Sequence, residues 1–286
     1  MLTIKFKLWR LRMKRLEQQG FTLVELAIVL VIIGLIVSSV LVGQDLIKSA
    51  ELRATTTQYN QFQAGVNTFL GKYNALPGDV STDFGLGAGQ GDGDGKIENS
   101  TGNGTAGTIT TNVQDFAPAS DGESTDFWAH LTASGKEMIP GGYDGGNTAE
   151  ITVNIPQMKF GGAGWMAMYY DHDRHDDNAT AATASNDQLN KHYFATGLVS
   201  ALTNALTIEY SFVPLDAFGI DDKIDDGVPN SGAVQSVLAG ASPDESGSTN
   251  AGASTAHCEN STPTPDEYQF TATTKNCALI FEMATF

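Results

Sequence analysis

The chain has 286 residues, and its 33 acidic residues outnumber its 16 lysines and arginines, which gives a formal net charge of −17 with histidine neutral. This balance argues against a nucleic-acid groove, which needs a basic stripe, and favours soluble display or the binding of divalent cations. The sequence contains no phosphate-binding loop, dinucleotide-binding fingerprint or nucleophile elbow, so we expect no enzyme and no catalytic residues.

The N-terminus joins a basic stretch to a long apolar run. Six of the first fifteen residues are Lys or Arg, and residues 26–42 contain no charged side chain. A helix over residues 21–42 covers about 33 Å, close to the hydrocarbon thickness of a bilayer. The basic stretch predicts a cytoplasmic N-terminus and an exported C-terminus. An ordinary signal anchor and a secretory signal peptide are the alternatives, but a signal peptide has a shorter apolar core and is cut after it.

The segment Gly20-Phe-Thr-Leu-Val-Glu25 resembles the prepilin signature of the type IV pilin and type II secretion pseudopilin superfamily. The resemblance implies cleavage between Gly20 and Phe21 by a prepilin peptidase, followed by N-methylation of Phe21. A carboxylate in lipid costs roughly 3 kcal/mol on insertion scales. The resemblance implies that Glu25 offsets this cost by pairing with the α-amine of Phe21 in a neighbouring subunit.

The N-terminal helix is expected to continue to residue 73, because no proline interrupts the sequence before Pro77. Its exported half has large side chains at spacings of three and four, which place them on one face that packs on a sheet. These are Tyr59, Phe62, Val66, Phe69 and Tyr73. We therefore expect a leader over 1–20, with Met13 as an alternative start, a helix over 21–73 whose transmembrane segment is 21–42, and a globular domain over 74–286.

Beyond the turn at Pro77 and Gly78 the expected elements are short. Residues 85–112 are dominated by Gly, Asp, Asn and Thr, and residues 240–266 by Ser, Thr, Gly and Pro, so both are expected as surface loops. Helices are expected at 127–132 and 214–226, and strands at 150–157, 165–170, 192–195, 234–238, 268–272 and 278–283. This order predicts an α+β fold in which a long N-terminal helix packs on an antiparallel sheet, as in pilins.

Several later motifs are similar to a pattern in large pilin-like proteins of Gram-negative bacteria. They are Ala75–Asp79, Gly91–Gly95, Phe127–Leu131, Ile139–Tyr143, Ile220–Gly227 and Pro229–Gly232.

Two acidic segments are candidate cation sites. In the first, Asp92, Asp94 and Glu98 have the spacing that lets a loop turn around a hard cation, but the final bidentate Glu of an EF-hand is missing. The second is at the C-terminal end of an expected helix, where the helix dipole prefers cations. It consists of Asp221, Asp222, Asp225 and Asp226. Calcium could compensate these charges, whereas the alternatives are a solvated Asp-Gly turn at the first segment, and Lys223 and backbone donors at the second.

The histidines and cysteines allow further expectations. His172 and His175 lie among carboxylates, but no His-Glu-x-x-His motif is present, so a polar loop is expected there and not a zinc site. His130 is expected to be partly buried and structural. Cys258 and Cys277 are the only cysteines, and in an exported chain they are expected to pair. Closing that loop would stabilise the fold by roughly 3 kcal/mol.

The expected function is that of a structural subunit, a minor pilin or pseudopilin of a type IV pilus or type II secretion pseudopilus. Its implied partners are other pilin or pseudopilin subunits, prepilin peptidase, the inner-membrane assembly platform and the membrane, with no nucleic acid. It would cross the inner membrane once before it enters a periplasmic or cell-surface filament. The alternative is a membrane-tethered, calcium-dependent binding module or adhesin that uses the signal for delivery alone.

Overall fold

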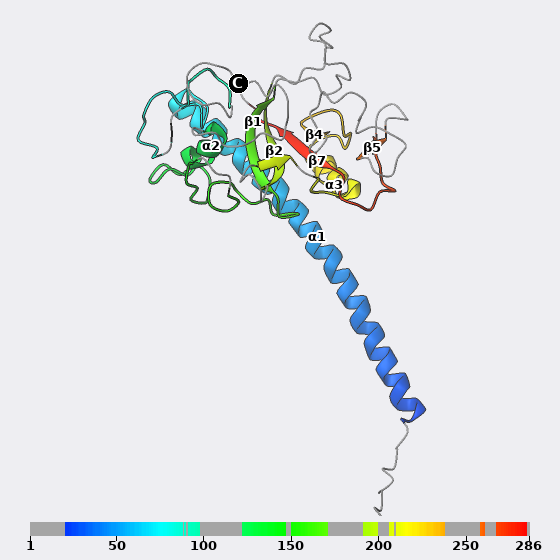
Figure 1. Ribbon diagram of the computed structural model, residues 1–286. Helices are drawn as coiled ribbons and strands as arrows, with labels where there is room; N and C mark the ends of the chain where they lie inside the picture. The colour runs from blue at the N-terminus through cyan, green and yellow to red at the C-terminus, as the bar shows by residue number, and fades with distance from the viewer. Residues whose placement is uncertain are drawn as a thin grey trace, which may run out of the picture. The chain divides into compact units, whose positions relative to one another are not determined.

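The computed structural model describes residues 21–87, 89, 91–97, 122–146, 150–170, 191–199, 206–208, 210–237, 258–260 and 267–284. Contacts divide the chain into two compact units, the first ending at Ile47 and the second running from Lys48 to Phe286. The elements in chain order are α1 (Leu23–Tyr73), α2 (Glu123–Leu131), β1 (Gly164–Tyr170), β2 (Lys191–Val199), β3 (Leu206–Ile208), α3 (Pro214–Ile224), β4 (Val234–Val237), β5 (Glu259–Asn260), β6 (Glu267–Tyr268) and β7 (Ala278–Glu282) (Figure 1).

Helix α1 is uninterrupted over 51 residues and passes through Val42 and Gly43 without a break (Figure 1). Its buried residues all lie in the second half and recur at helical spacing, which confirms the predicted packing face. They are Leu52, Thr55, Gln58, Tyr59, Phe62, Gly65, Val66 and Phe69. Tyr73, at the end of the predicted face, is half-buried.

The main sheet is antiparallel in the order β1-β2-β7-β4, with β3 paired to β2, and β5 and β6 form a separate two-stranded sheet. The C-terminal strand β7 therefore lies between β2 and β4, with Phe194 opposite Phe281 and Gln235 opposite Ile280. Successive side chains of β7 point to opposite faces of the sheet, and those from Ala278 to Phe281 are all fully buried, so both faces are covered here. The fold is α+β, as the sequence predicts.

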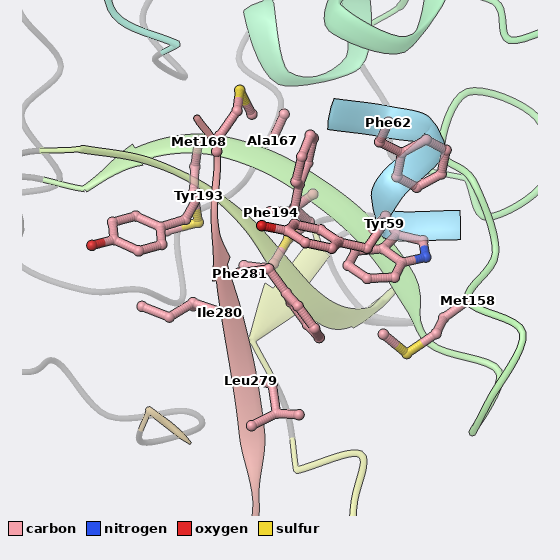
Figure 2. Close-up of a cluster of buried hydrophobic side chains, with 14 of the residues drawn as sticks. Tyr59, Phe62, Met158, Ala167, Met168, Tyr193, Phe194, Leu279, Ile280 and Phe281 are labelled. Atoms are coloured by element: carbon pink, nitrogen blue, oxygen red, sulfur yellow. The ribbon is translucent and has the colours of Figure 1, made fainter. Parts of the chain in front are cut away.

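Aromatic side chains join the C-terminal half of α1 to the sheet. The ring centroid of Phe62 lies 4.8 Å from that of Trp128, 5.6 Å from Trp165 and 5.9 Å from Phe194. The hydroxyl of Tyr59 donates to the backbone oxygen of Glu282 at the end of β7 (2.8 Å). Figure 2 shows Tyr59 and Phe62 of α1 beside Phe194. Burying each large apolar side chain contributes about 1.5–3 kcal/mol, so this cluster anchors the helix to the sheet.

Two expected strands differ from the structure because local turns replace strand pairing. The strand predicted over 150–157 is wrong: the amides of residues 153–155 all donate to the carbonyl of Glu150, and Thr152 has a φ of 77°. This tight turn leaves only isolated bridges. The strand predicted over 268–272 ends at Tyr268. There the chain turns, and the amide of Phe270 donates a hydrogen bond to the carbonyl of Tyr268 (3.0 Å). Strands β3 and β5 were not predicted.

The C-terminal segment is linked covalently to the sheet. Cys258 and Cys277 form a disulfide, which confirms the predicted pairing. The carbonyl of Cys277 accepts hydrogen bonds from the amides of Ser211 (2.9 Å) and Phe212 (3.1 Å), and that of Cys258 accepts one from Gln269 (2.8 Å). The disulfide therefore ties Cys258, directly before β5, to the start of β7, and backbone hydrogen bonds hold the segment before α3 at the same place.

Candidate functional site

The first unit presents an apolar helix whose side chains are exposed. From Leu23 to Ile47 the large apolar side chains range from 86% exposed at Leu23 to 49% at Val29. Helix α1 is long and apolar enough to cross a membrane by length and composition. An exposed apolar surface of this extent calls for cover by lipid or by other chains. At Gly34, where a Cβ would have no atom within 4 Å, a neighbouring helix could approach closely.

Thr22 and Glu25 cap the N-terminus of α1 reciprocally. The amide and the hydroxyl of Thr22 donate to Glu25 Oε2 at 2.8 and 2.9 Å, and the amide of Glu25 donates to Thr22 Oγ1 at 3.2 Å. This is a capping box, and its Thr-x-x-Glu spacing is visible in the sequence. Sequence reasoning gave Glu25 a partner in another subunit and missed the one in its own chain. A carboxylate has about four acceptor sites, so the cap leaves capacity for a further donor.

The turn after α1, helix α2 and the loop that includes Gly89 and residues 91–97, here called the Gly-Asp loop, pack together around His130. The amide of Gly78 donates to His130 Nδ1 (2.8 Å), so Nε2 carries the proton and donates to the carbonyl of Gly89 (3.0 Å). Burial lowers the pKa of His130, which keeps the ring neutral. His130 is structural, as expected from the sequence, but it is fully buried and not partly buried, and it links three segments.

The buried carboxylate of Asp79 accepts hydrogen bonds from the backbone of the Gly-Asp loop. Its side chain is 3% exposed, and its two oxygens accept hydrogen bonds from the amides of Gly93 (2.6 Å) and Gly95 (2.8 Å). Glu123 Oε1 accepts from the amide of Asp92 at 3.2 Å. A Cβ at Gly91 would lie 2.4 Å from Glu123 Oε1, so glycine is required for this close approach. The loop therefore brings its own carboxylates against those of the turn and of α2.

These contacts create the first acidic cluster, Asp79, Asp92 and Glu123, whose carboxylate oxygens lie within 4.8 Å of one another. Of the predicted ligands, only Asp92 is in it: Asp94 accepts from the amide of Lys96 (2.8 Å), and Glu98 lies outside the described residues. Burial, with added repulsion from Asp94 and Asp92, raises the pKa of Asp79 to about 6. A hard cation with oxygen ligands would relieve this repulsion.

Sequence reasoning missed Asp79 and Glu123, which are far from the loop in the chain. Asp79 belongs to the motif Ala75–Asp79, but spacing within one segment does not show that separate segments meet. A cation at this loop, which lacks a terminal bidentate Glu, would need carboxylates from elsewhere, and these two residues lie where they would supply them.

The second acidic cluster is Asp221, Asp225 and Asp226, at the end of α3. Asp222, the fourth predicted ligand, is not part of it. Asp221 is fully buried and accepts from the hydroxyl of Tyr268 (2.8 Å) and the amide of Gly227 (3.3 Å). Backbone amides of Val228 and Ala233 and the hydroxyl of Ser231 donate to the other two carboxylates, whereas Lys223 Nζ donates to the Gly219 carbonyl (2.9 Å). Backbone amides thus stabilise part of the negative charge of this cluster.

The buried carboxyl of Asp221 predicts a pH-dependent stability. Burial raises its pKa from 3.8 to about 7, so the folded state holds a proton that the unfolded state has lost. Its contribution to the free energy of unfolding is complete below 3.8 and is lost as pH rises through 7. In the wild type this carboxyl lowers the free energy of unfolding by up to about 1.4 kcal/mol per pH unit between pH 4 and 7. We expect Asp221→Asn, which keeps an acceptor for Tyr268, to lose this contribution, so that its melting temperature falls less over the same range.

The matched control is Asp222→Asn, since Asp222 is an exposed neighbour on the same helix. It should retain the wild-type pH dependence of melting in chelator. Equal slopes for wild type and Asp221→Asn would contradict the assignment of the pH dependence to Asp221.

The predicted histidine loop, with His172 and His175, lies outside the described residues.

Comparison with known proteins adds one finding at the N-terminus. Residues 15–41 match the prokaryotic N-terminal methylation motif. No curated protein and no solved structure matches the chain. The matched residues include the Gly20–Phe21 junction, Glu25 and most of the exposed apolar segment of α1. The chain therefore carries the N-terminal signal of a type IV pilin-like precursor, joined to an α+β body.

Proposed function

We propose that this chain is a structural subunit, a minor pilin or pseudopilin, of a type IV pilus or type II secretion pseudopilus. Prepilin peptidase cuts it between Gly20 and Phe21 and methylates the new N-terminus. The observation that carries the proposal is the methylation motif standing directly before a helix whose apolar side chains are exposed from Leu23 to Ile47. In this role the helices of other subunits replace lipid around α1 as the filament forms.

Membrane storage precedes assembly in this proposal. The six basic residues of the leader hold the N-terminus in the cytoplasm, and the body folds outside the inner membrane. The inner-membrane assembly platform then extracts the subunit into a periplasmic or cell-surface filament. The role needs no catalysis, and the pilin-motif family is structural rather than enzymatic.

Filament incorporation tests this proposal. The full-length protein should be produced in a host with a type IV pilus or type II secretion apparatus, with the fibres sheared from the cells and analysed by immunoblot. We expect the processed subunit in the sheared fraction, and we expect it to be absent when prepilin peptidase is deleted. Retention of all the protein in the membrane fraction, in a host that makes fibres, would contradict the proposal.

A second candidate function is favoured by the first acidic cluster. Two of its three carboxylates, Asp79 and Glu123, are buried, at 3% and 7% exposed, and all three lie close enough to share one ion. Calcium bound there would fix the Gly-Asp loop and make a surface whose order depends on the ion. The protein would then act as a membrane-tethered, calcium-dependent binding module or adhesin that uses the pilin signal for delivery.

A further inference from the structure

Aspartate followed by glycine is prone to a spontaneous rearrangement of the main chain. The glycine amide nitrogen attacks the side-chain carboxyl carbon, a C–N bond forms, and the carboxyl OH leaves as water with the amide hydrogen. Water then opens the cyclic imide, either back to aspartate or to isoaspartate, in which the main chain runs through the side-chain carboxyl. Glycine favours this reaction because it has no Cβ and its backbone is permissive. The pairs within the described residues are Asp92–Gly93, Asp94–Gly95, Asp144–Gly145 and Asp226–Gly227.

In three of these pairs a buried carboxylate accepts the hydrogen of the attacking amide. The amides of Gly93 and Gly95 donate to the two oxygens of Asp79 (2.6 and 2.8 Å). The amide of Gly227 donates to Oδ1 of Asp221, which is fully buried (3.3 Å). The amide must lose its hydrogen to attack, and a negatively charged acceptor both holds that hydrogen and opposes its loss. Each of these hydrogen bonds therefore protects the aspartate that precedes the glycine.

The aspartates of the same three pairs are restrained as well. Asp92 accepts from the amide of Asp94 (3.0 Å), Asp94 from the amide of Lys96 (2.8 Å), and Asp226 from the amide of Val228 (2.8 Å). Closing the imide ring turns the aspartate side chain away from a staggered rotamer. A carboxyl group that is held by such a hydrogen bond therefore reacts more slowly.

The pair Asp144–Gly145 has neither restraint. Asp144 is exposed, and among the described residues neither its carboxylate nor the amide of Gly145 makes a hydrogen bond. The chain is nevertheless anchored on both sides of the pair. The amide of Asp144 donates to the carbonyl of Val153 (3.1 Å), and the carbonyl of Gly146 accepts from the hydroxyl of Thr125 (2.6 Å). The two reacting groups are thus unrestrained on an open surface.

We propose that Asp144 is a site of spontaneous isoaspartate formation in the folded protein, and that Asp79 and Asp221 protect the other three pairs. Isoaspartate lengthens the main chain by one carbon between the two anchors, so the segment must bulge or release one of them. The same segment forms part of the wall of a cavity of about 630 Å³, so the modification alters that surface as the protein ages. This inference does not depend on a role in a filament.

Peptide mapping of aged protein tests the proposal. The full-length protein is kept in detergent and chelator at neutral pH for several weeks, digested, and analysed by mass spectrometry with electron-transfer fragmentation, which distinguishes isoaspartate from aspartate. Because a protected amide must first leave a hydrogen bond to a charged group, we expect at least about tenfold less isoaspartate at Asp92, Asp94 and Asp226 than at Asp144. In a denatured control all four should react at similar rates. Similar levels at all four in the folded protein, or none at Asp144 while the denatured control forms it, would overturn the proposal.

The variant Asp79→Asn tests the protective role directly. Asparagine keeps one side-chain oxygen, so at least one of the two glycine amides of the Gly-Asp loop loses its acceptor. We expect isoaspartate to rise at least about tenfold at Asp92 or Asp94. The level at Asp226 should stay as in the wild type, which reports that the fold is intact. An unchanged level at both loop positions would overturn the protection by Asp79, and if the variant does not fold, the comparison of sites within the wild type decides.

Discussion

Replacing Glu25 with alanine is expected to leave the protein in the membrane and to remove it from fibres. Insertion should improve, because a carboxylate near the apolar segment no longer has to be accommodated. If Glu25 pairs with the α-amine of Phe21 in a neighbouring subunit, as we propose for the filament, assembly should fail, because that amine loses its partner. Removing one member of a buried ion pair costs about 3–5 kcal/mol, more than a hundredfold in association at each contact. The measurement is the ratio of sheared to membrane-bound protein.

Thr22→Val separates this pairing from the capping box. The substitution keeps the branched shape of the side chain but removes the hydroxyl that both donates to and accepts from Glu25. Loss of a helix cap costs about 1 kcal/mol, so Thr22→Val subunits should still enter fibres. If Thr22→Val fails as completely as Glu25→Ala, capping is the role of Glu25. If Glu25→Ala enters fibres as efficiently as wild type, the inter-subunit pairing is wrong.

Calcium is expected to raise the melting temperature of the purified protein in detergent by about 5–10 °C relative to chelator. An ion that binds only the folded form at a hundredfold excess over its Kd adds roughly 2.7 kcal/mol, and each kcal/mol shifts melting by about 2–4 °C in a domain of this size. The test belongs at about 10 mM calcium, which is a hundredfold above the Kd of about 10⁻⁴ M at the tighter end of extracellular sites. An equal concentration of magnesium should achieve less, since Mg²⁺ gives up its water ligands reluctantly.

Single substitutions show which acidic cluster carries the calcium effect. Glu123→Gln keeps an oxygen that can accept from the Asp92 amide and removes one charge from the first cluster, whereas Asp225→Asn removes one from the second. Asp94→Asn is the matched control, because Asp94 lies in the same loop but outside the group of three. We expect Glu123→Gln to lose most of the shift and Asp94→Asn to keep it. Identical melting of the wild type in calcium, magnesium and chelator would contradict ion binding at both clusters.

The sequence predicts those parts of the fold in which the spacing of apolar residues along one segment decides which side chains are buried. The face of α1 that carries Phe62 and Phe69 repeats at helical spacing, so its burial follows from periodicity alone. Strands β1, β2 and β7 could be predicted as apolar runs, because their side chains are buried on both faces of the sheet, including those of β1 at its edge. The disulfide followed from the cysteine count and the expected export.

Elements governed by contacts between distant segments could not be predicted in this way. Residues 150–157 alternate like a strand, but the carbonyl of Glu150 gathers three amides into a turn that hydrophobic pattern does not reveal. The first acidic cluster depends on Asp79 and Glu123 meeting the Gly-Asp loop, and this follows from the packing of α2 on the turn after α1. The Thr22–Glu25 cap is the exception, since its spacing is local and readable in the sequence, yet it was not predicted.

The mass of the mature N-terminus tests the central claim most directly. Wild-type protein, produced together with a prepilin peptidase and analysed by mass spectrometry, should begin at N-methylated Phe21 and retain the whole of α1. Gly20→Val should remain an unprocessed precursor, because the residue before the cut then carries a branched side chain. A wild-type N-terminus located after Val42, or a Gly20→Val protein that still begins at Phe21, would contradict the assignment of a pilin-like signal.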